Sequence, residues 1–185
     1  MYPIVDMIDH QTIAAVQKLE DLDTAINSKV DVIFLLAGSI VDVKDLVDKV
    51  KAADKRVFLH MEFIGGIAAD RSGVAYVANY VQPTGIISTK NNIIRIAKET
   101  GLMAIQRIFL IDRGAVVRGI KSAEQCQPDA IEVMPGIMPR IIREMTDMTP
   151  LPIIAGGLVG NEGEIAEGLK AGALAVSTSL IDLWK

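Results

Sequence analysis

Two motifs rich in glycine and hydroxyl residues carry the strongest chemical signal in the sequence. The run IIAGG ends at Gly156 and Gly157, and the next apolar run ends in Ser177, Thr178 and Ser179. Glycines let backbone N–H groups approach an anion closely, and a helix N-terminus adds free N–H donors and a positive dipole. We therefore expect a phosphate site formed by Gly156, Gly157, Leu158 and Ser177–Ser179. The alternative is that these motifs are a tight turn and a helix cap.

Polar residues also interrupt apolar runs that should be buried. His60 and Glu62 lie two positions apart in FLHME, where an extended strand would turn both side chains to one side. The alternative for His60 is a structural residue of the core. Arg107 and Glu132 stand in the runs AIQRIF and AIEVM, where an uncompensated charge would be costly. We expect either a structural Arg107–Glu132 ion pair or a pair that also orients Arg107 toward an anion. Lys90, after the run TGIIST, is a further candidate partner for an anion.

No group of residues points to covalent or metal-dependent catalysis. The sequence has no G-x-S-x-G motif and no Asp-rich run of the magnesium-binding type. It has two histidines and one cysteine, Cys126, which makes a His/Cys zinc site improbable. We therefore expect no catalytic residue, no metal ion and no cofactor. Any chemistry would rest on His60, Glu62, Lys90 and Glu132, which are compatible with an isomerase or a lyase and equally with plain ligand binding.

Eight short apolar runs supply the elements that would position these residues. They are continuous rather than alternating, which is typical of parallel strands buried on both faces. Amphipathic patterns over 42–53, 91–100 and 162–172 predict helices between them. The predicted strands are Pro3–Met7, Asp31–Ala37, Arg56–Met61, Gly85–Ser88, Met103–Phe109, Ala130–Met134, Pro152–Ala155 and Ala173–Thr178.

Eight strand–helix units predict a compact α/β fold, a (β/α)₈ barrel of the TIM type, with residues 1–185 as a single domain. The alternative is an open doubly wound sheet, but eight strands and the lack of a glycine-rich first turn argue against it. Residues 65–80 are the least regular segment, and we expect a loop followed by a short helix there. In a barrel the carboxyl ends of all strands share one mouth, so both groups of polar residues would meet there.

The composition excludes several classes of protein. Of the 185 residues, 50% are hydrophobic and 23% are charged, which indicates a globular rather than a disordered chain. No apolar run approaches the roughly 20 residues that span a bilayer, and we expect neither a signal peptide nor a membrane partner. A single cysteine cannot form an internal disulfide, so we expect a cytoplasmic protein.

The net charge of −4 is unevenly distributed along the chain. Residues 71–143 carry ten Lys and Arg against five Asp and Glu, whereas both flanking segments are net acidic. This asymmetry indicates either a chance distribution of charge or a surface that binds a polyanion.

The motifs also resemble those of a known family. FLHMEFIGGIAAD, TGIISTK, AIQRIFLID, PDAIEVMPG, IIAGGLV and GALAVSTS, in this order, resemble the bacterial glycerol-3-phosphate responsive antiterminators. The terminal Leu183-Trp184 resembles them too, and the resemblance extends from Pro3 to Lys185. This chain departs at Glu62, where family members commonly have Asp, and at Met134, where they commonly have Leu.

The resemblance implies a non-enzymatic regulator. Such a protein senses glycerol 3-phosphate and binds leader mRNA of glycerol-utilisation genes, which promotes read-through of a terminator. The phosphate would lie at the loops of Gly156–Leu158 and Ser177–Ser179. The glycerol moiety would lie near His60, Glu62, Lys90, Arg107 and Glu132.

The resemblance also implies an RNA-binding face. Contacts to RNA phosphates should dominate it, because only 4% of the residues are aromatic. The rival interpretations are a small barrel enzyme acting on a sugar or triose phosphate and a scaffold with an empty barrel. The sequence does not define the oligomeric state, and a homodimer is one of the alternatives. The candidate RNA-binding residues are Arg95, Lys98, Arg113, Arg118, Lys121, Arg140 and Arg143.

Overall fold

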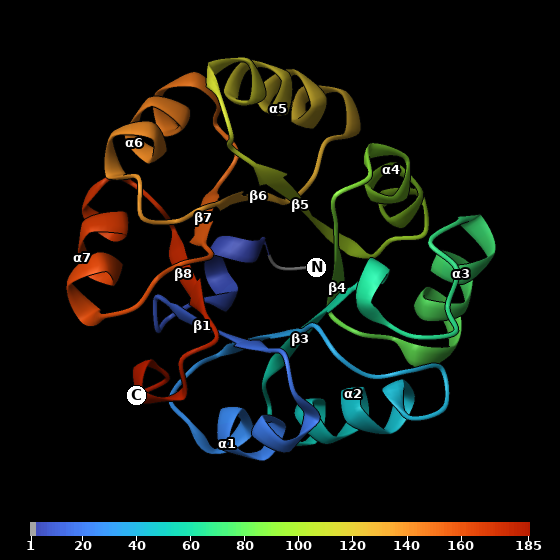
Figure 1. The fold of residues 1–185 in the computed structure, drawn as a ribbon. Helices are drawn as coiled ribbons and strands as arrows, with labels where there is room; N and C mark the ends of the chain where they lie inside the picture. The colour runs from blue at the N-terminus through green and yellow to red at the C-terminus, as the bar shows by residue number, and fades with distance from the viewer. Residues whose placement is uncertain (1–2) are drawn as a thin grey trace.

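Eight parallel strands close into a barrel, and helices surround it (Figure 1). The computed structural model describes residues 3–185. Each strand pairs with its neighbours in sequence order, and β8 closes the ring by pairing with β1, as in Thr12 opposite Val176. The strands are β1 (Thr12–Val16), β2 (Val32–Leu35), β3 (Arg56–His60), β4 (Gly85–Ser88), β5 (Met103–Phe109), β6 (Ala130–Met134), β7 (Ile153–Gly156) and β8 (Ala175–Thr178).

A helix follows each of the first seven strands. Those predicted over 42–53, 91–100 and 162–172 are present within a few residues of these bounds, and the segment 65–80 contains a loop and a short helix as expected. Side-chain caps start three of them, because Asp70, Asp112 and Asn161 each accept a hydrogen bond from the amide three residues later. The helices are α1 (Leu22–Asn27), α2 (Val43–Ala52), α3 (Arg71–Tyr76), α4 (Asn91–Glu99), α5 (Arg113–Cys126), α6 (Pro139–Met148) and α7 (Glu162–Lys170).

The first strand differs from the prediction. Pro3–Met7, expected to be the first strand, contains instead a 3₁₀ helix over Ile4–Met7, and the true β1 is Thr12–Val16. The 3₁₀ helix lies within the ring of strands, where Ile4 and Ile8 pack against the barrel interior (Figure 1). The prediction failed because PIVDM is a typical apolar strand run, whereas two alanines weaken the strand signal of TIAAV.

Residues Ile4–Ile8 therefore form a plug at the amino-terminal end of the barrel. The segment after the plug is held to the start of β2, since the amides of Asp9 and His10 donate to the Asp31 carboxylate at 2.9 and 2.6 Å. The plug is buried against inward-facing residues that include Val32 and Phe34. It fills the end of the barrel opposite to the strand ends that carry the predicted site.

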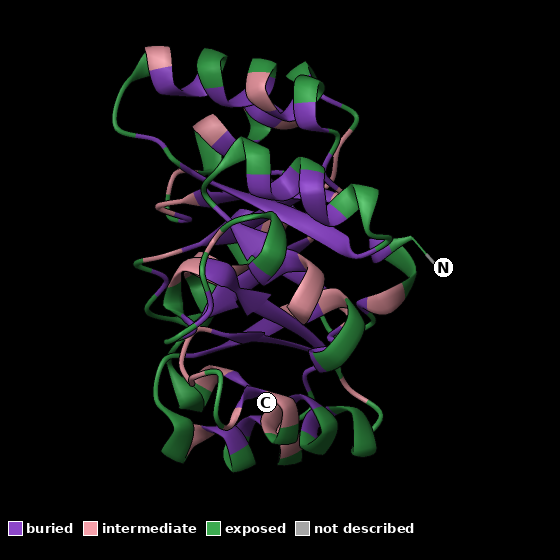
Figure 2. Cartoon of the chain, turned by 90° about the vertical axis from the view of Figure 1, so that its right-hand side faces the viewer, coloured by how far each residue is buried: buried purple, intermediate pink, exposed green. Residues whose placement is uncertain are grey.

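The core has three parts because each strand alternates between two buried faces. Inward side chains such as Phe34, Phe58 and Ile105 fill the barrel with the plug. Outward side chains pack beneath α1–α4 in one cluster and beneath α5–α7 in another. Figure 2 accordingly shows buried strands within helices that expose only their outer sides.

Candidate functional site

A layer of polar side chains closes the carboxyl-terminal end of the barrel. His60, Arg107, Glu132 and Ser177 each lie two residues beyond an inward-facing apolar residue of the same strand, so all four face inward. They come from β3, β5, β6 and β8, and each is at most 5% exposed. Polar side chains this deeply buried require partners, and their contacts define the site.

Arg107, Glu132 and Ser177 form one connected network. The Arg107 Nε–H donates to Glu132 Oε2 at 2.6 Å, and the Ser177 hydroxyl donates to Glu132 Oε1 at 2.7 Å. Adjacent strands bring the pair together, because Arg107 is the register partner of Glu132 in the β5–β6 ladder. The predicted ion pair is confirmed. It leaves the guanidinium Nη2 buried without a hydrogen-bond partner among the described residues.

Gly156 makes room for this network. A Cβ at Gly156 would lie 2.6 Å from Glu132 Oε1 and closer still to the Ser177 hydroxyl. The residue is therefore a glycine because the Glu132–Ser177 contact occupies the space that a side chain would need.

We expect Gly156→Ala to lower the free energy of unfolding by about 1–3 kcal/mol, since the added methyl overpacks a rigid buried contact. Chemical denaturation followed by circular dichroism measures the effect. Gly160→Ala is the matched control, because a Cβ there would meet its nearest atom, Glu164 Oε2, at an ordinary 3.6 Å. Equal stabilities of the two variants would contradict the explanation given for Gly156.

His60, Glu62 and Ser88 form a second polar group beside the first. His60 and Glu62 lie close together as expected, but not through strand alternation, because the strand ends at His60 and a 3₁₀ turn, Met61–Phe63, carries Glu62. His60 Nδ1 lies 3.2 Å from Glu62 Oε2. The Ser88 hydroxyl accepts from the Lys90 amide and donates its one proton to Glu62 Oε1. Ser88 thus holds the Glu62 side chain in place.

The surroundings of Glu62 favour its ionised form. Burial opposes ionisation of its carboxyl group, but the contacts with His60 and Ser88 outweigh burial, so the pKa of Glu62 lies below its usual value. The side chain is therefore a carboxylate, and a hydrogen-bond acceptor only, at neutral pH.

Four buried polar atoms of these two groups have no hydrogen-bond partner among residues 3–185. They are Nδ1 and Nε2 of His60, Oε2 of Glu62 and Nη2 of Arg107. The His60–Glu62 distance is short, but the two groups are not oriented for a hydrogen bond. Unpaired buried groups are costly, so this cluster is suited to a ligand that supplies both donors and acceptors.

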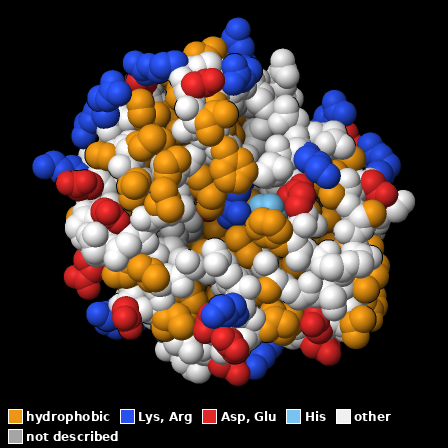
Figure 3. Space-filling view, viewed as in Figure 1, with side chains coloured by type: hydrophobic (Ala, Val, Ile, Leu, Met, Phe, Trp, Pro, Cys, Tyr) orange, Lys and Arg blue, Asp and Glu red, His pale blue; other side chains and the backbone are white. Residues whose placement is uncertain are grey.

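A pocket of about 590 Å³ opens above the polar layer. Figure 3 shows the corresponding hollow at the centre of the barrel, where basic, acidic and histidine side chains appear between hydrophobic ones. Phe63, which lines the pocket, stacks on His60 with ring centroids 4.1 Å apart, so His60 adjoins the pocket wall, although neither His60 nor Glu62 is itself a lining residue. The pocket is lined by Ala15, Gln17, Leu36, Phe63, Arg107, Phe109, Met134, Gly157–Gly160 and Ser177–Leu180.

The two predicted phosphate loops meet at this pocket. Gly157, Leu158 and Ser177–Ser179 line it together with Arg107. Gly157 and Leu158 have φ values of 77° and 62°, so the backbone turns sharply at the pocket edge, and Leu158 adopts a conformation that non-glycine residues rarely take. The two loops come from adjacent strands, because Gly156 is the register partner of Ser177.

The helix ends near these loops contribute less than the sequence predicted. The final helix is only a 3₁₀ turn, Ile181–Leu183, which is too short to provide a helix N-terminus. At the start of α7 two amides are already used. The Glu164 amide donates a hydrogen bond to the Asn161 side chain, and the Gly160 amide donates one to the Glu164 carboxylate. Anion binding would therefore rest on Arg107, the pocket hydroxyls and the loop amides.

Thr178 is already engaged in holding the loops together. Its hydroxyl donates to the Val159 carbonyl and accepts from the Leu180 amide, both at 3.2 Å. Its carbonyl accepts from the buried Trp184 indole at 2.9 Å. Thr178 thus links the β7 loop, the β8 loop and the last turn of the chain, which leaves the Ser179 hydroxyl as the more accessible donor.

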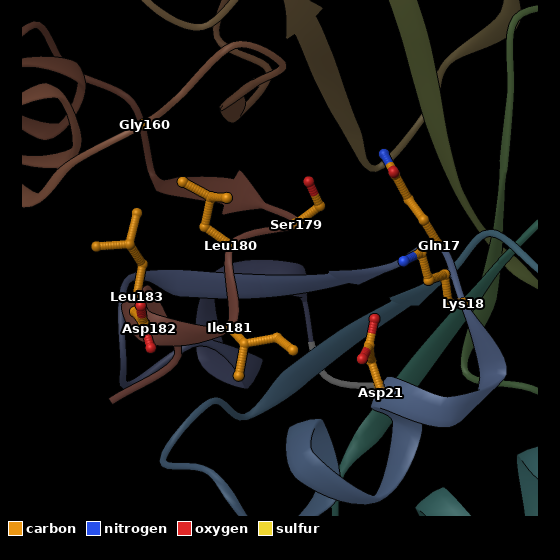
Figure 4. A pocket seen from close by; sticks show the side chains of 9 residues that line it. All are labelled: Gln17, Lys18, Asp21, Gly160, Ser179, Leu180, Ile181, Asp182 and Leu183. Atoms are coloured by element: carbon orange, nitrogen blue, oxygen red, sulfur yellow. The ribbon is translucent and has the colours of Figure 1, made fainter.

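A second hollow of about 570 Å³ adjoins the first and shares Gln17, Gly160, Ser179 and Leu180 with it. Figure 4 shows Ser179 and Gln17 at the ends of β8 and β1. Gln17 was not predicted as a site residue, because the first strand was expected at Pro3–Met7. With Thr12–Val16 recognised as β1, Gln17 would have been placed at a strand end facing the mouth.

The apolar wall of the pocket was also not predicted from the sequence. Phe63, Phe109 and Met134 follow or end strands, where apolar side chains give no signal of a site. Lys90 is exposed at the start of α4 and, like His60, Glu62 and Glu132, is not among the residues that line the pocket. Its contribution to the site is its backbone amide, which holds Ser88.

The candidate RNA-binding residues lie exposed on α4, α5 and α6. Figure 3 shows basic side chains spread along this margin of the molecule. Several of the seven are already paired: Lys98 with Asp129, Arg113 with Glu144, Arg118 with Asp112, and Arg143 with the Lys170 carbonyl. Arg95, Lys121 and Arg140 have no ion pair among the described residues.

Residues 3–185 hold neither a candidate metal site nor a candidate membrane span. No group of three or more His, Cys, Asp or Glu side chains is arranged to hold a metal ion in this part of the chain. None of its helices is both long and apolar enough to cross a bilayer.

Comparisons with known proteins agree with the motifs. Two crystal structures have sequences that are each 33% identical to this chain. One is the glycerol uptake operon antiterminator regulatory protein from Listeria monocytogenes, and the other is a glycerol uptake operon antiterminator-related protein from Thermotoga maritima. The first has a TM-score of 0.91 with 95% of both chains covered, and the second a TM-score of 0.83 with 94% of this chain and 96% of the other covered. Escherichia coli YgcP is 32% identical over 98% of this chain and 96% of its own length.

More distant structures share the fold alone. Orotidine 5'-phosphate decarboxylase from Pyrococcus horikoshii is 18% identical with a TM-score of 0.69, covering 90% of this chain and 88% of its own, so enzymes share this barrel. The family model for the glycerol-3-phosphate responsive antiterminator matches residues 12–184. This match confirms the resemblance seen in the motifs, and the chain belongs to the family of glycerol-3-phosphate responsive antiterminators.

Proposed function

We propose that this protein is a cytoplasmic, non-enzymatic regulator that binds glycerol 3-phosphate in the barrel mouth. In response it binds leader mRNA of glycerol-utilisation genes and promotes transcriptional read-through. The observation that carries the ligand part is the buried, unpartnered Nη2 of Arg107 in a pocket lined by Gly157 and Ser177–Ser179. A guanidinium beside hydroxyl and amide donors matches a phosphate group.

The polar layer suits the rest of such a ligand. A triol monoester carries hydroxyls that both donate and accept hydrogen bonds, and the site offers the Glu62 carboxylate and the His60 ring to receive them. The glycerol moiety would lie over His60 and Glu62, with the phosphate toward Arg107, the Ser179 hydroxyl and the loop amides. The backbone amide of Lys90 takes part indirectly, because it holds the Ser88 hydroxyl that in turn holds Glu62.

The RNA part of the proposal rests on the family and on charge. Arg95, Lys121 and Arg140 are exposed basic residues without an ion pair among the described residues, so their charge is available to RNA phosphates. Binding through phosphates should be strongly dependent on salt. Ligand binding in the mouth would order the strand-end loops that lead into these helices, and coupling between the two sites must be reciprocal.

Isothermal titration of the purified protein with glycerol 3-phosphate, with and without a leader transcript, tests the proposal. We expect saturable ligand binding that becomes tighter when the RNA is present. Ligand binding without any RNA binding at any ligand concentration would contradict the regulatory part. Turnover of triose or pentose phosphates by the same preparation would instead favour the enzyme interpretation.

We expect the triple variant Arg95→Glu, Lys121→Glu and Arg140→Glu to bind leader RNA much more weakly while it keeps its affinity for glycerol 3-phosphate. The slope of log K against log salt should fall by about 2, because each RNA phosphate that is no longer neutralised lowers it by roughly 0.7. Filter binding over a range of salt concentrations measures it. The control is a second triple variant with the same change of charge beside α1 and α2, across the barrel (Figure 1): Lys29→Glu, Lys49→Glu and Lys51→Glu. An unchanged slope in the first variant would exclude this face.

A further inference from the structure

We infer that Glu62, held by Ser88, makes the site selective for a phosphorylated polyol over the corresponding phosphorylated ketone. The inference rests on the proposed function, because it concerns the ligand of the same pocket. It goes further in naming the atom that distinguishes two metabolites of equal charge and nearly equal size, which differ only in whether the central carbon carries a hydroxyl or a carbonyl oxygen.

The first step is that Glu62 can only accept. Ser88 has one hydroxyl proton, which it donates to Glu62 Oε1, while its oxygen accepts from the Lys90 amide. The second oxygen, Oε2, is buried and has no hydrogen-bond partner among the described residues. The lowered pKa of Glu62 means that no proton resides on this carboxyl group at neutral pH.

The second step is that the other unpartnered atoms of the polar layer need a partner that accepts as well as donates. His60 Nδ1 lies 3.2 Å from Oε2 but is not oriented to bond to it, and both ring nitrogens of His60 are unpartnered among the described residues. Arg107 faces inward from β5, two strands away from β3, and its Nη2 is a buried donor that also lacks a hydrogen-bond partner among the described residues. A ligand hydroxyl can donate to Glu62 and accept from one of these groups at the same time.

The third step is that a carbonyl oxygen cannot do this. It accepts only, so it would face the Glu62 carboxylate as a second acceptor and leave Oε2 buried and unpaired. Sites built to bind a hydroxyl reject analogues that lack it for this reason. The ketone should therefore bind worse than a ligand that has no oxygen at all on the central carbon.

Isothermal titration with three probes tests the order of affinities. The probes are glycerol 3-phosphate, 3-hydroxypropyl phosphate, which lacks the central hydroxyl, and dihydroxyacetone phosphate, which has a ketone there. We expect glycerol 3-phosphate to bind at least about tenfold more tightly than 3-hydroxypropyl phosphate, and dihydroxyacetone phosphate to bind most weakly. Equal affinity of the wild-type protein for the polyol and the ketone would overturn the inference.

Variants identify the residue responsible. Glu62→Gln keeps the shape but supplies an amide that donates to a carbonyl, so the affinities for the polyol and the ketone should come within about threefold of each other. Glu62→Asp keeps the carboxylate and should keep the preference for the polyol over the ketone. A preference that is lost in Glu62→Gln but kept in Glu62→Asp therefore depends on the carboxylate and not on a general disturbance of the site. Glu124→Gln, an exposed carboxylate on α5, is the control and should change nothing.

The outcomes separate this inference from the proposed function. If Glu62→Gln retains the full preference for the polyol, the selectivity lies elsewhere and the inference is wrong, although glycerol 3-phosphate still binds. If the wild-type protein binds neither glycerol 3-phosphate nor inorganic phosphate, the proposed function itself fails, and the inference fails with it.

Discussion

Replacing Glu132 by leucine is expected to lower the free energy of unfolding by about 3–5 kcal/mol. Glu132 is fully buried and is the only carboxylate paired with Arg107 among the described residues, so the variant leaves a buried guanidinium without a counter-charge. Leucine has a similar volume, which keeps the contribution of a cavity small. Urea denaturation of the wild-type and variant proteins measures the difference.

Two further variants show whether charge is the cause. The double variant Arg107→Met with Glu132→Leu removes both charges and should recover most of the missing stability, because a buried ion pair and a packed apolar pair are often similarly stable. Even so, the double variant should not bind glycerol 3-phosphate, since the guanidinium is gone. Glu99→Ala removes an exposed partner of Arg71 and should change stability by less than about 1 kcal/mol. No recovery in the double variant would contradict the electrostatic explanation.

Gly157→Asp is expected to weaken glycerol 3-phosphate binding by about 100-fold or more. The substitution places a negative charge on the loop that lines the pocket beside Ser177 and Ser179. Two like charges about 4 Å apart repel by roughly 4 kcal/mol at the effective dielectric constant of a protein surface. Isothermal titration measures the affinity.

Gly157→Asn separates this charge effect from backbone strain. Asparagine has the shape of aspartate and tolerates the left-handed conformation that Gly157 adopts at φ 77°, and a Cβ there would meet Met134 at a tight but adjustable 3.3 Å. We expect the Asn variant to keep most of its affinity. If the two variants bind equally well, or if Gly157→Asp binds as tightly as the wild-type protein, the phosphate does not lie at this loop.

Much of the fold could be predicted because the signals were local. Continuous apolar runs such as VIFLL and GIIS are typical of strands buried on both faces, and the helical patterns between them indicate the parallel direction. The first strand could not be found in this way. Burial of Ile4 and Ile8 within the barrel depends on the closed barrel itself, which no short window of sequence contains.

The candidate site was predictable where a charge stood in an apolar run. Arg107 and Glu132 could not both be buried unless they met, and the β5–β6 register brings them together. Gln17 and Phe63 gave no such signal, because neither residue type is unusual at a strand end. The paired states of Lys98 and Arg113 also escaped prediction, since their partners Asp129 and Glu144 lie 31 residues away in the chain.

The plug at Ile4–Ile8 has a kinetic consequence. With the amino-terminal end of the barrel filled by buried side chains, a small molecule bound over the polar layer can enter and leave only through the mouth. A macromolecule seated across the mouth would therefore lengthen the residence time of that molecule without touching it. Such a cover would slow the dissociation of the ligand without changing its contacts with the protein. Stopped-flow exchange of the ligand, with and without the macromolecule, can detect this slower dissociation.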